Sequence, residues 1–191
     1  MGILKKFLGG KKNLTSVLAD TQKNLFNIYG ISHPTDAQKL NAAVYLCIAG
    51  IAIINDLSGR HQFRQFIDEL QEAARTLSKP LSMRVGELTN NKDTLGKIIS
   101  EFPGSIPVTE ATQINGLAAF EATYFSVGEG LMLEILSRGQ GPHGAPGYAA
   151  IVVSNGILGE GNPNLNLMAA MTELHNFMSE LAALLRQSLK K

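Results

Sequence analysis

The chain has 191 residues, of which 45% are hydrophobic and 17% are charged. This composition excludes a disordered chain and suits one globular domain of ordinary size. The formal net charge of +1 provides no overall field for nucleic acid or an acidic substrate, so we expect no nucleic-acid partner.

The first twelve residues alternate apolar and basic side chains. On a helix, the apolar residues would share one side and the first two lysines would lie toward the other. Such a segment can rest in the headgroup region of an anionic membrane or enter a groove of a partner protein. A terminal turn docked on the chain's own core is the alternative. The candidate contact residues are Ile3, Leu4, Lys5, Lys6, Phe7, Leu8, Lys11 and Lys12.

The cysteine content and the N-terminal residues indicate the cellular compartment of the protein. The single cysteine, Cys47, cannot form an internal disulfide and fits a small buried residue in a reducing compartment. The apolar part of residues 1–10 is too short for a secretion signal, and Lys6 occupies the position where a myristoylation pattern has Ser or Thr. We therefore expect a cytoplasmic protein, with residues 1–12 as the candidate segment for contact with a membrane.

Helical spacing predicts a first helix over about residues 14–29 and a central helix over about residues 35–57. Pro34, Thr35 and Gln38 form a start signal of the capping-box type. The run from Ala42 to Ile54 is apolar on every side but shorter than the roughly 20 residues of a membrane span. We predict a buried helix around which the rest of the chain packs.

Between the central helix and the next one, a turn contains Asp56 and His61. An amphipathic helix follows over about residues 63–79, and its mixed charges are typical of a solvated face. No second His or Cys stands at metal spacing near this turn, so we expect no metal and no cofactor. The candidate ligand site, if the protein has one, comprises Asp56, His61, Glu121 and His175.

The middle of the chain is less regular. Pro80 can begin a short helix to residue 88, another is expected over residues 95–102, and a boundary near 103–110 would divide the chain if it has two halves. From Thr112 a helix is predicted, with a kink, a close crossing or a short break at Gly128–Gly130. No Glu-x-x-His pair occurs, which argues against a di-iron bundle.

The segment Gly139–Gly144 matches G-x-G-x-x-G, but a helix is predicted before it and Pro146-Gly147 should prevent a helix from starting directly after it. We interpret it as a connector. Residues 148–154 could be strand or helix, and helix is favoured because no partner strand is visible. Asn162-Pro163 predicts the start of the last helix, whose apolar stripe runs to the C-terminal end. On that stripe Met171, His175 and Met178 are more typical of a core than of a haem or soft-metal site.

The sequence thus predicts an all-α fold with one domain over residues 13–191 and six to eight helices. No family motif is recognised. The function that these patterns favour is a non-enzymatic interaction or scaffold protein that self-associates, peripheral at a membrane through residues 1–12. The alternative is a small-ligand-binding or metal-binding helical enzyme with a pocket between helices.

Overall fold

Six helices and one small sheet make up the described part of the chain. The computed structural model describes residues 12–58, 63–84, 113–140, 144–159, 162 and 165–189, without the side chains of residues 56–58. These residues are 81% helical, which confirms the all-α single-domain prediction. The elements are α1 (Leu14–Ile28), α2 (Asp36–Ser58), α3 (Arg64–Ser78), β1 (Ser82–Arg84), β2 (Gln113–Asn115), α6 (Gly116–Arg138), α7 (Gly144–Leu158) and α8 (Leu167–Ser188).

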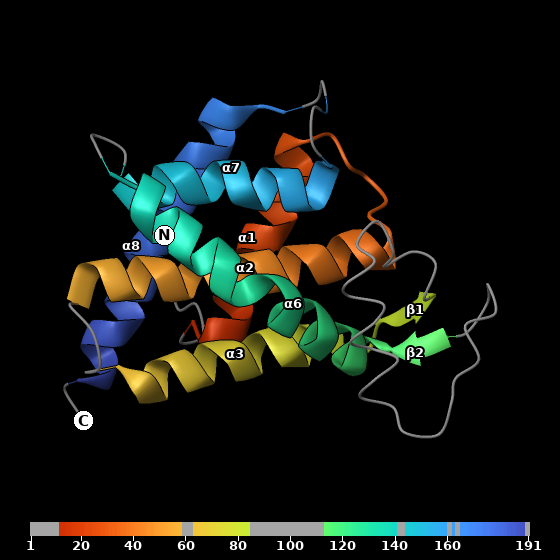
Figure 1. The fold of residues 1–191 in the computed structure, drawn as a ribbon, viewed down its shortest axis with the longest axis horizontal. Coiled ribbons are helices and arrows are strands. Elements are labelled where there is room, and N and C mark those ends of the chain that lie inside the picture. Colours follow the sequence, from red (N-terminus) through yellow and green to blue (C-terminus); the bar gives the residue numbers. More distant parts are fainter. Residues whose placement is uncertain are drawn as a thin grey trace, which may run out of the picture.

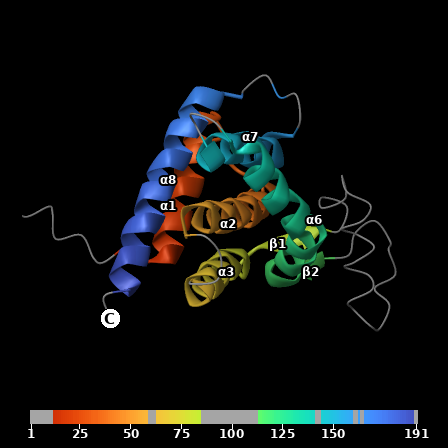
Figure 2. The same cartoon turned by 60° about the vertical axis from the view of Figure 1, so that its left-hand side comes forward.

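Helix α2 is the predicted central helix, and the other five surround it. In Figure 2, where α2 is seen obliquely, α1 and α8 lie on one side, α6 on the other, α7 above and α3 below. Its start is the predicted capping box, because the Thr35 amide donates to Gln38 Oε1 at 2.9 Å and the Gln38 amide donates to Thr35 Oγ1 at 3.2 Å. All residues from Ala42 to Ile54 except Tyr45 are buried.

By length and composition, α2 is also the one described helix that could cross a membrane, over Asp36–Asn55. However, 72% of that window is buried inside the protein. An apolar helix wrapped by five others buries its surface against protein, and its apolar character is explained by that position.

Helices α1 and α8 lie side by side along one edge of the molecule (Figure 2). Asn13 begins α1 with a capping box, in which its Oδ1 accepts from the Ser16 amide at 2.8 Å and its amide donates to Ser16 Oγ at 3.0 Å. Gly30, at φ 69°, ends the helix as the sequence predicts. The apolar stripe of α8 packs against the fold, where its buried members include Leu174, Phe177, Leu181 and Leu185.

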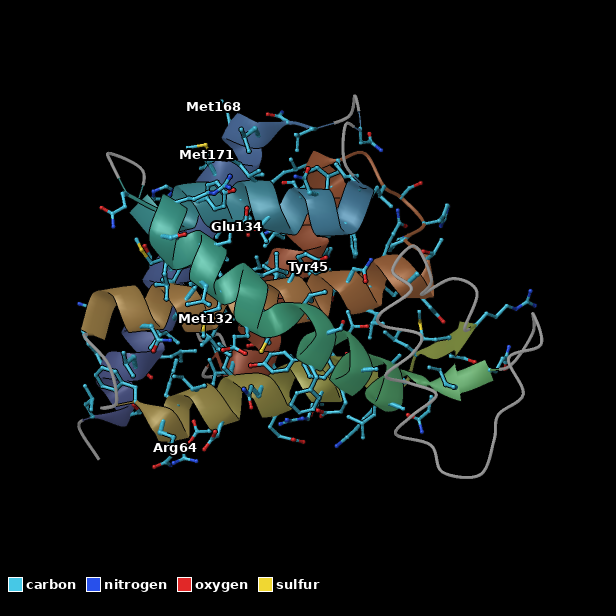
Figure 3. All side chains as sticks on the ribbon, viewed as in Figure 1. Tyr45, Arg64, Met132, Glu134, Met168 and Met171 are labelled. Atoms are coloured by element: carbon cyan, nitrogen blue, oxygen red, sulfur yellow. The ribbon has the colours of Figure 1, made fainter. Side chains whose placement is uncertain are left out.

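One glycine, Gly156, allows α7 to lie close to α2. Helix α6 runs without a break through Gly128, where an added Cβ would lie 3.8 Å from Ile48 Cδ1, an ordinary contact distance, so the expected break is absent from this stretch. On α7, a Cβ at Gly156 would lie 2.5 Å from the ring of Tyr45, and Figure 3 shows Tyr45 between α2 and α7. Asn41 Nδ2 donates to the Gly156 carbonyl at 3.0 Å. Glycine is therefore required where the ring of Tyr45 contacts α7.

The prediction of a helix beginning at Pro80 is wrong over Ser82–Arg84. These residues form β1, which pairs antiparallel with β2 so that Met83 lies opposite Ile114, and both of these side chains are buried. The sheet lies beside the start of α6 (Figure 1). The expected helix over 95–102 and the boundary near 103–110 lie outside the described residues.

The helical alternative for residues 148–154 is confirmed, since they belong to α7. Three expected helix boundaries are wrong. Helix α6 begins at Gly116 and not at Thr112, because Gln113–Asn115 form β2. Helix α7 begins at Gly144 despite Pro146, because an amide in the first turn has no partner within the helix and proline loses nothing there. The last helix begins at Leu167 and not at Asn162, since Asn166 supplies the cap by accepting from the Ala169 amide at 3.2 Å.

Candidate interaction groove

A groove of about 870 Å³ opens where the start of α1, one face of α3 and the end of α8 meet. Its floor is apolar, with Leu14, Phe66 and Ala73 buried and Leu184 half-buried. Its rim is polar and exposed, and includes residues from α3 and α8. The exposed rim residues on these two helices are Glu69, Glu72, Thr76, Gln187 and Ser188. We call this site the α1–α3–α8 groove.

The amphipathic pattern of α3 creates one wall of the groove. Phe66, Leu70 and Ala73 recur at helical spacing and are buried, while Glu69 and Glu72 are exposed beside them. Helices α1 and α2 pack against the apolar side of α3. Phe66 and Ala73 lie at the floor of the groove, and the two acidic residues stand at its edge.

The two carboxylates of the rim have different partners. Glu72 lies 3.4 Å from Lys79 Nζ and 3.9 Å from a guanidinium nitrogen of Arg75. Glu69 accepts only from the neutral Gln65 amide, Nε2 to Oε1 at 3.0 Å, and forms no ion pair within the described part of the chain. The groove thus presents one acidic group that is available to a basic ligand.

Lys12 lies where the N-terminal segment joins the fold. It is paired with Glu180 of α8 and lies 3.9 Å from Asp20 of α1. Lys12 Nζ donates a hydrogen bond to Glu180 Oε1, and this bond raises the pKa of Lys12. Lys12 lines the α1–α3–α8 groove and also a polar groove of about 570 Å³ between α1 and α8, whose acidic residues are Asp20, Glu173 and Glu180.

The apolar surface extends past the groove at the C-terminal end of α8. A smaller hollow of about 140 Å³ shares Phe66, Glu69 and Ser188 with the groove and adds Phe63 and Leu189. Leu189 is 63% exposed. Other large apolar side chains on the described surface lie elsewhere: Phe125 and Leu133 on α6, and Met168, which Figure 3 shows at the start of α8.

The candidate contact residues from Ile3 to Lys11 lie outside the described residues, and Lys12 alone is placed. His61 also lies outside them, and Asp56 belongs to the last turn of α2 without a described side chain. Of the four residues of the candidate ligand site, the structure therefore describes the side chains of two, Glu121 and His175.

Each of these two side chains has a partner of its own. Glu121 Oε1 accepts from Arg75 Nε at 2.5 Å, across the α3–α6 interface. His175 Nδ1 donates to the Met171 carbonyl at 2.7 Å within α8. Both contacts are those of structural residues, and among the described residues no three His, Cys, Asp or Glu side chains stand together where a metal could bind.

Arg75 and Glu121 belong to a polar cluster between α2, α3 and α6. Beside them, Gln71 Nε2 donates to the Tyr124 hydroxyl at 2.8 Å. Burial raises the pKa of the neighbouring Cys47 thiol to about 12, so Cys47 is a poor nucleophile or metal ligand at neutral pH. The arrangement joins three helices and shows no nucleophile with an adjacent base.

Sequence reasoning did not find the groove. It treated Glu69 and Glu72 as a solvated face, and they are exposed. The apolar floor comes from three helices that are far apart in the chain, so no local pattern could reveal it. Comparison with the profiles of known protein families, with curated proteins and with solved structures finds no match.

Proposed function

We propose that this protein is a non-enzymatic helical interaction module that rests on the cytoplasmic surface of an anionic membrane through residues 1–12. The observation that carries the proposal is the position of Lys12. Lys12 is exposed and directly precedes Asn13, the cap of α1, so the basic segment leaves the fold at its surface. A segment attached in this way can reach a membrane while α1 stays packed.

The composition of the segment supports binding to an anionic surface. Lysines near such a membrane contribute about 1 kcal/mol each, and the apolar residues Ile3, Leu4, Phe7 and Leu8 add burial in the acyl boundary. Among the described residues, the polar cluster and His175 are engaged in structural contacts, which supports a non-enzymatic role.

The test is co-sedimentation of the full chain with vesicles of equimolar phosphatidylglycerol and phosphatidylcholine at low and high salt. Reversing Lys5 and Lys6 to Glu should weaken binding at least about 30-fold, because roughly 2 kcal/mol of attraction is lost. The control reverses Lys23 and Arg64, which are exposed on α1 and α3, so that net charge changes equally. Equal loss in both variants, or no binding by the unmodified chain, would refute the membrane proposal.

Self-association is part of the proposed function. The stripe of α8 is largely used inside the fold, and we assign the contact between two copies to Phe125 and Leu133, two exposed apolar side chains on α6. Light scattering of the full chain and of Phe125→Ser/Leu133→Ser tests it. We expect a concentration-dependent mass for the unmodified chain and a monomer for the variant.

An enzyme or ligand binder with a pocket between helices is the competing class. Elemental analysis of the purified protein separates the two classes in part. Stoichiometric iron, zinc or copper would contradict the non-enzymatic proposal.

A further inference from the structure

We propose that the α1–α3–α8 groove binds the chain's own residues 1–11, so that the apolar side of this segment is covered until an anionic membrane competes for it. The docking is independent of the proposed function, whereas release by a membrane rests on it. The groove and the segment would then form an autoinhibitory contact, in which one set of apolar residues has two exclusive binding surfaces.

The connection between segment and groove supports this occupant. Lys12, Asn13 and Leu14 themselves line the groove, so the eleven preceding residues are attached at its edge. A linked ligand has an effective concentration in the millimolar range, far above that of a free partner. Gly9-Gly10 supplies the conformational freedom for the chain to reverse direction just before Lys12.

The chemistry of the two surfaces is complementary. As a helix, the segment would present Ile3 with Phe7 and Leu4 with Leu8, pairs four residues apart, to the apolar floor. The floor is formed by Phe66, Ala73 and Leu184 among others. Eight helical residues span about 12 Å, which is short enough for a groove between three helices.

The charges of the groove and of residues 1–11 favour the same orientation, in which the apolar side of the segment faces the groove floor. Glu69 stands on the groove rim with a neutral partner only, and Glu72 stands one turn further along α3. Lys5 and Lys6 lie toward the side of the predicted helix away from its apolar residues, where they can approach the acidic rim while those residues face the floor. The membrane would offer the same two features, an apolar layer beneath negative charge, which is why it can compete.

The first experiment is disulfide trapping in the full chain. Leu4→Cys is combined with Thr76→Cys, an exposed position on the groove rim. The matched control combines Leu4→Cys with Thr172→Cys, which is exposed on α8 outside the groove. Thr172 lies about 12 Å along the helix from Glu180, the partner of Lys12, so the tether can reach it. The buried Cys47 stays in both.

We expect an intramolecular disulfide to form at least about tenfold faster with Thr76→Cys than with Thr172→Cys at low protein concentration. Equal rates would overturn the docking. Disulfides formed mainly between chains would also overturn it, since the occupant would then be a second copy.

The second experiment changes the rim without touching the segment. Glu69→Lys places a positive charge in the groove, and Asp68→Lys makes the same change at the neighbouring exposed residue, which does not line the groove. Relative to Asp68→Lys, Glu69→Lys should lower the trapping rate about fivefold, as expected for the loss of one exposed charge pair, and should increase binding to the phosphatidylglycerol vesicles. Identical behaviour of the two variants in trapping would overturn the docking.

The two proposals fail differently. If no variant binds vesicles but Thr76→Cys is trapped selectively, the membrane function is wrong and the docking stands. If vesicles are bound but trapping is unselective, the docking is wrong and the membrane function stands.

Discussion

The hydroxyl groups of Tyr29 and Ser154 lie 2.5 Å apart, and both residues are buried. Tyr29 ends α1 and Ser154 lies in α7, so this contact joins two helices that flank α2. Burial raises the pKa of Tyr29, and the hydrogen bond to Ser154 opposes that shift. Each hydroxyl would lose its partner if the other were removed, and water cannot readily replace it.

A double-mutant cycle on this pair should therefore show coupling. We expect Tyr29→Phe and Ser154→Ala each to lower the free energy of unfolding by about 1–2 kcal/mol, and the double variant to lose clearly less than their sum. Urea unfolding measures each value. Tyr45→Phe is the control, because Tyr45 also has a pKa raised by burial but no hydrogen bond is found for its hydroxyl within the described residues, and it should change by less than about 0.5 kcal/mol. Additive losses would contradict the coupling.

The raised pKa of the Cys47 thiol should make the protein less stable at alkaline pH. Burial is the main cause that raises its pKa to about 12, while Arg75 lowers it and Glu121 raises it to smaller extents. The thiol of the unfolded chain ionises near the ordinary value of 9.0, so between these values the unfolded state binds fewer protons. The free energy of unfolding then falls as pH rises, by at most about 1.4 kcal/mol per pH unit.

Cys47→Ala should remove this dependence between about pH 9 and pH 10, while lowering stability by a constant amount at neutral pH. Burial also raises the pKa values of Tyr29, Tyr45 and Tyr124. Above about pH 10 these tyrosines therefore lower the free energy of unfolding further, both in the unmodified protein and in Cys47→Ala. Urea unfolding at several pH values measures the two slopes. Parallel curves from pH 8 to pH 10 would show that the thiol is not the cause.

Gly116 and Gly130, both in α6, should respond to alanine in opposite directions. A Cβ at Gly116 would lie 2.0 Å from the Ser78 carbonyl oxygen and 2.7 Å from Leu81 Cβ, so the backbone of α6 would have to move. We expect Gly116→Ala to destabilise by about 2 kcal/mol or more. Gly130 has no atom within 4 Å of that position, and Gly130→Ala should stabilise by up to about 1 kcal/mol. Thermal unfolding distinguishes the two, and a shift of the same sign would contradict the close contact.

The long helices could be predicted from the sequence because their evidence is local. The spacing of Leu14, Leu18 and Leu25, or the pair Thr35 and Gln38, lies within a few turns of chain, and the structure confirms both helices. The two strands could not be predicted in this way. Each has three residues, too few for a period to appear, and Met83 meets Ile114 from 31 positions away.

The groove and the ion pairs between helices could not be predicted, because they join residues that are far apart in the chain and meet only in the folded structure. Arg75 and Glu121 are 46 residues apart, and Glu69 gains its role only because α8 passes near α3. The residues that the sequence singled out by type, Glu121 and His175, turned out to have structural partners. A carboxylate on a mixed-charge helical face looks the same in the sequence whether it borders a groove or open solvent.

Two ion pairs between helices provide the last prediction. Arg75 and Glu121 join α3 to α6 with side chains that are 27% and 26% exposed, whereas Lys12 and Glu180 join the start of α1 to α8 at 52% and 36%. Removing Glu121 leaves a half-buried guanidinium with only the more distant Glu72, 3.9 Å away. We expect Glu121→Gln to cost about 1–2 kcal/mol.

Glu180→Gln should cost less than about 0.5 kcal/mol, because water and salt screen an exposed pair. The two substitutions make the same chemical change, so each is the control for the other. Urea unfolding at low salt and at 1 M NaCl measures both, and salt should abolish the small effect at Glu180 while leaving most of the effect at Glu121. Equal losses at low salt, or a loss at Glu121 that disappears in salt, would mean that the contact between α3 and α6 is as solvated as the one at the N-terminal end.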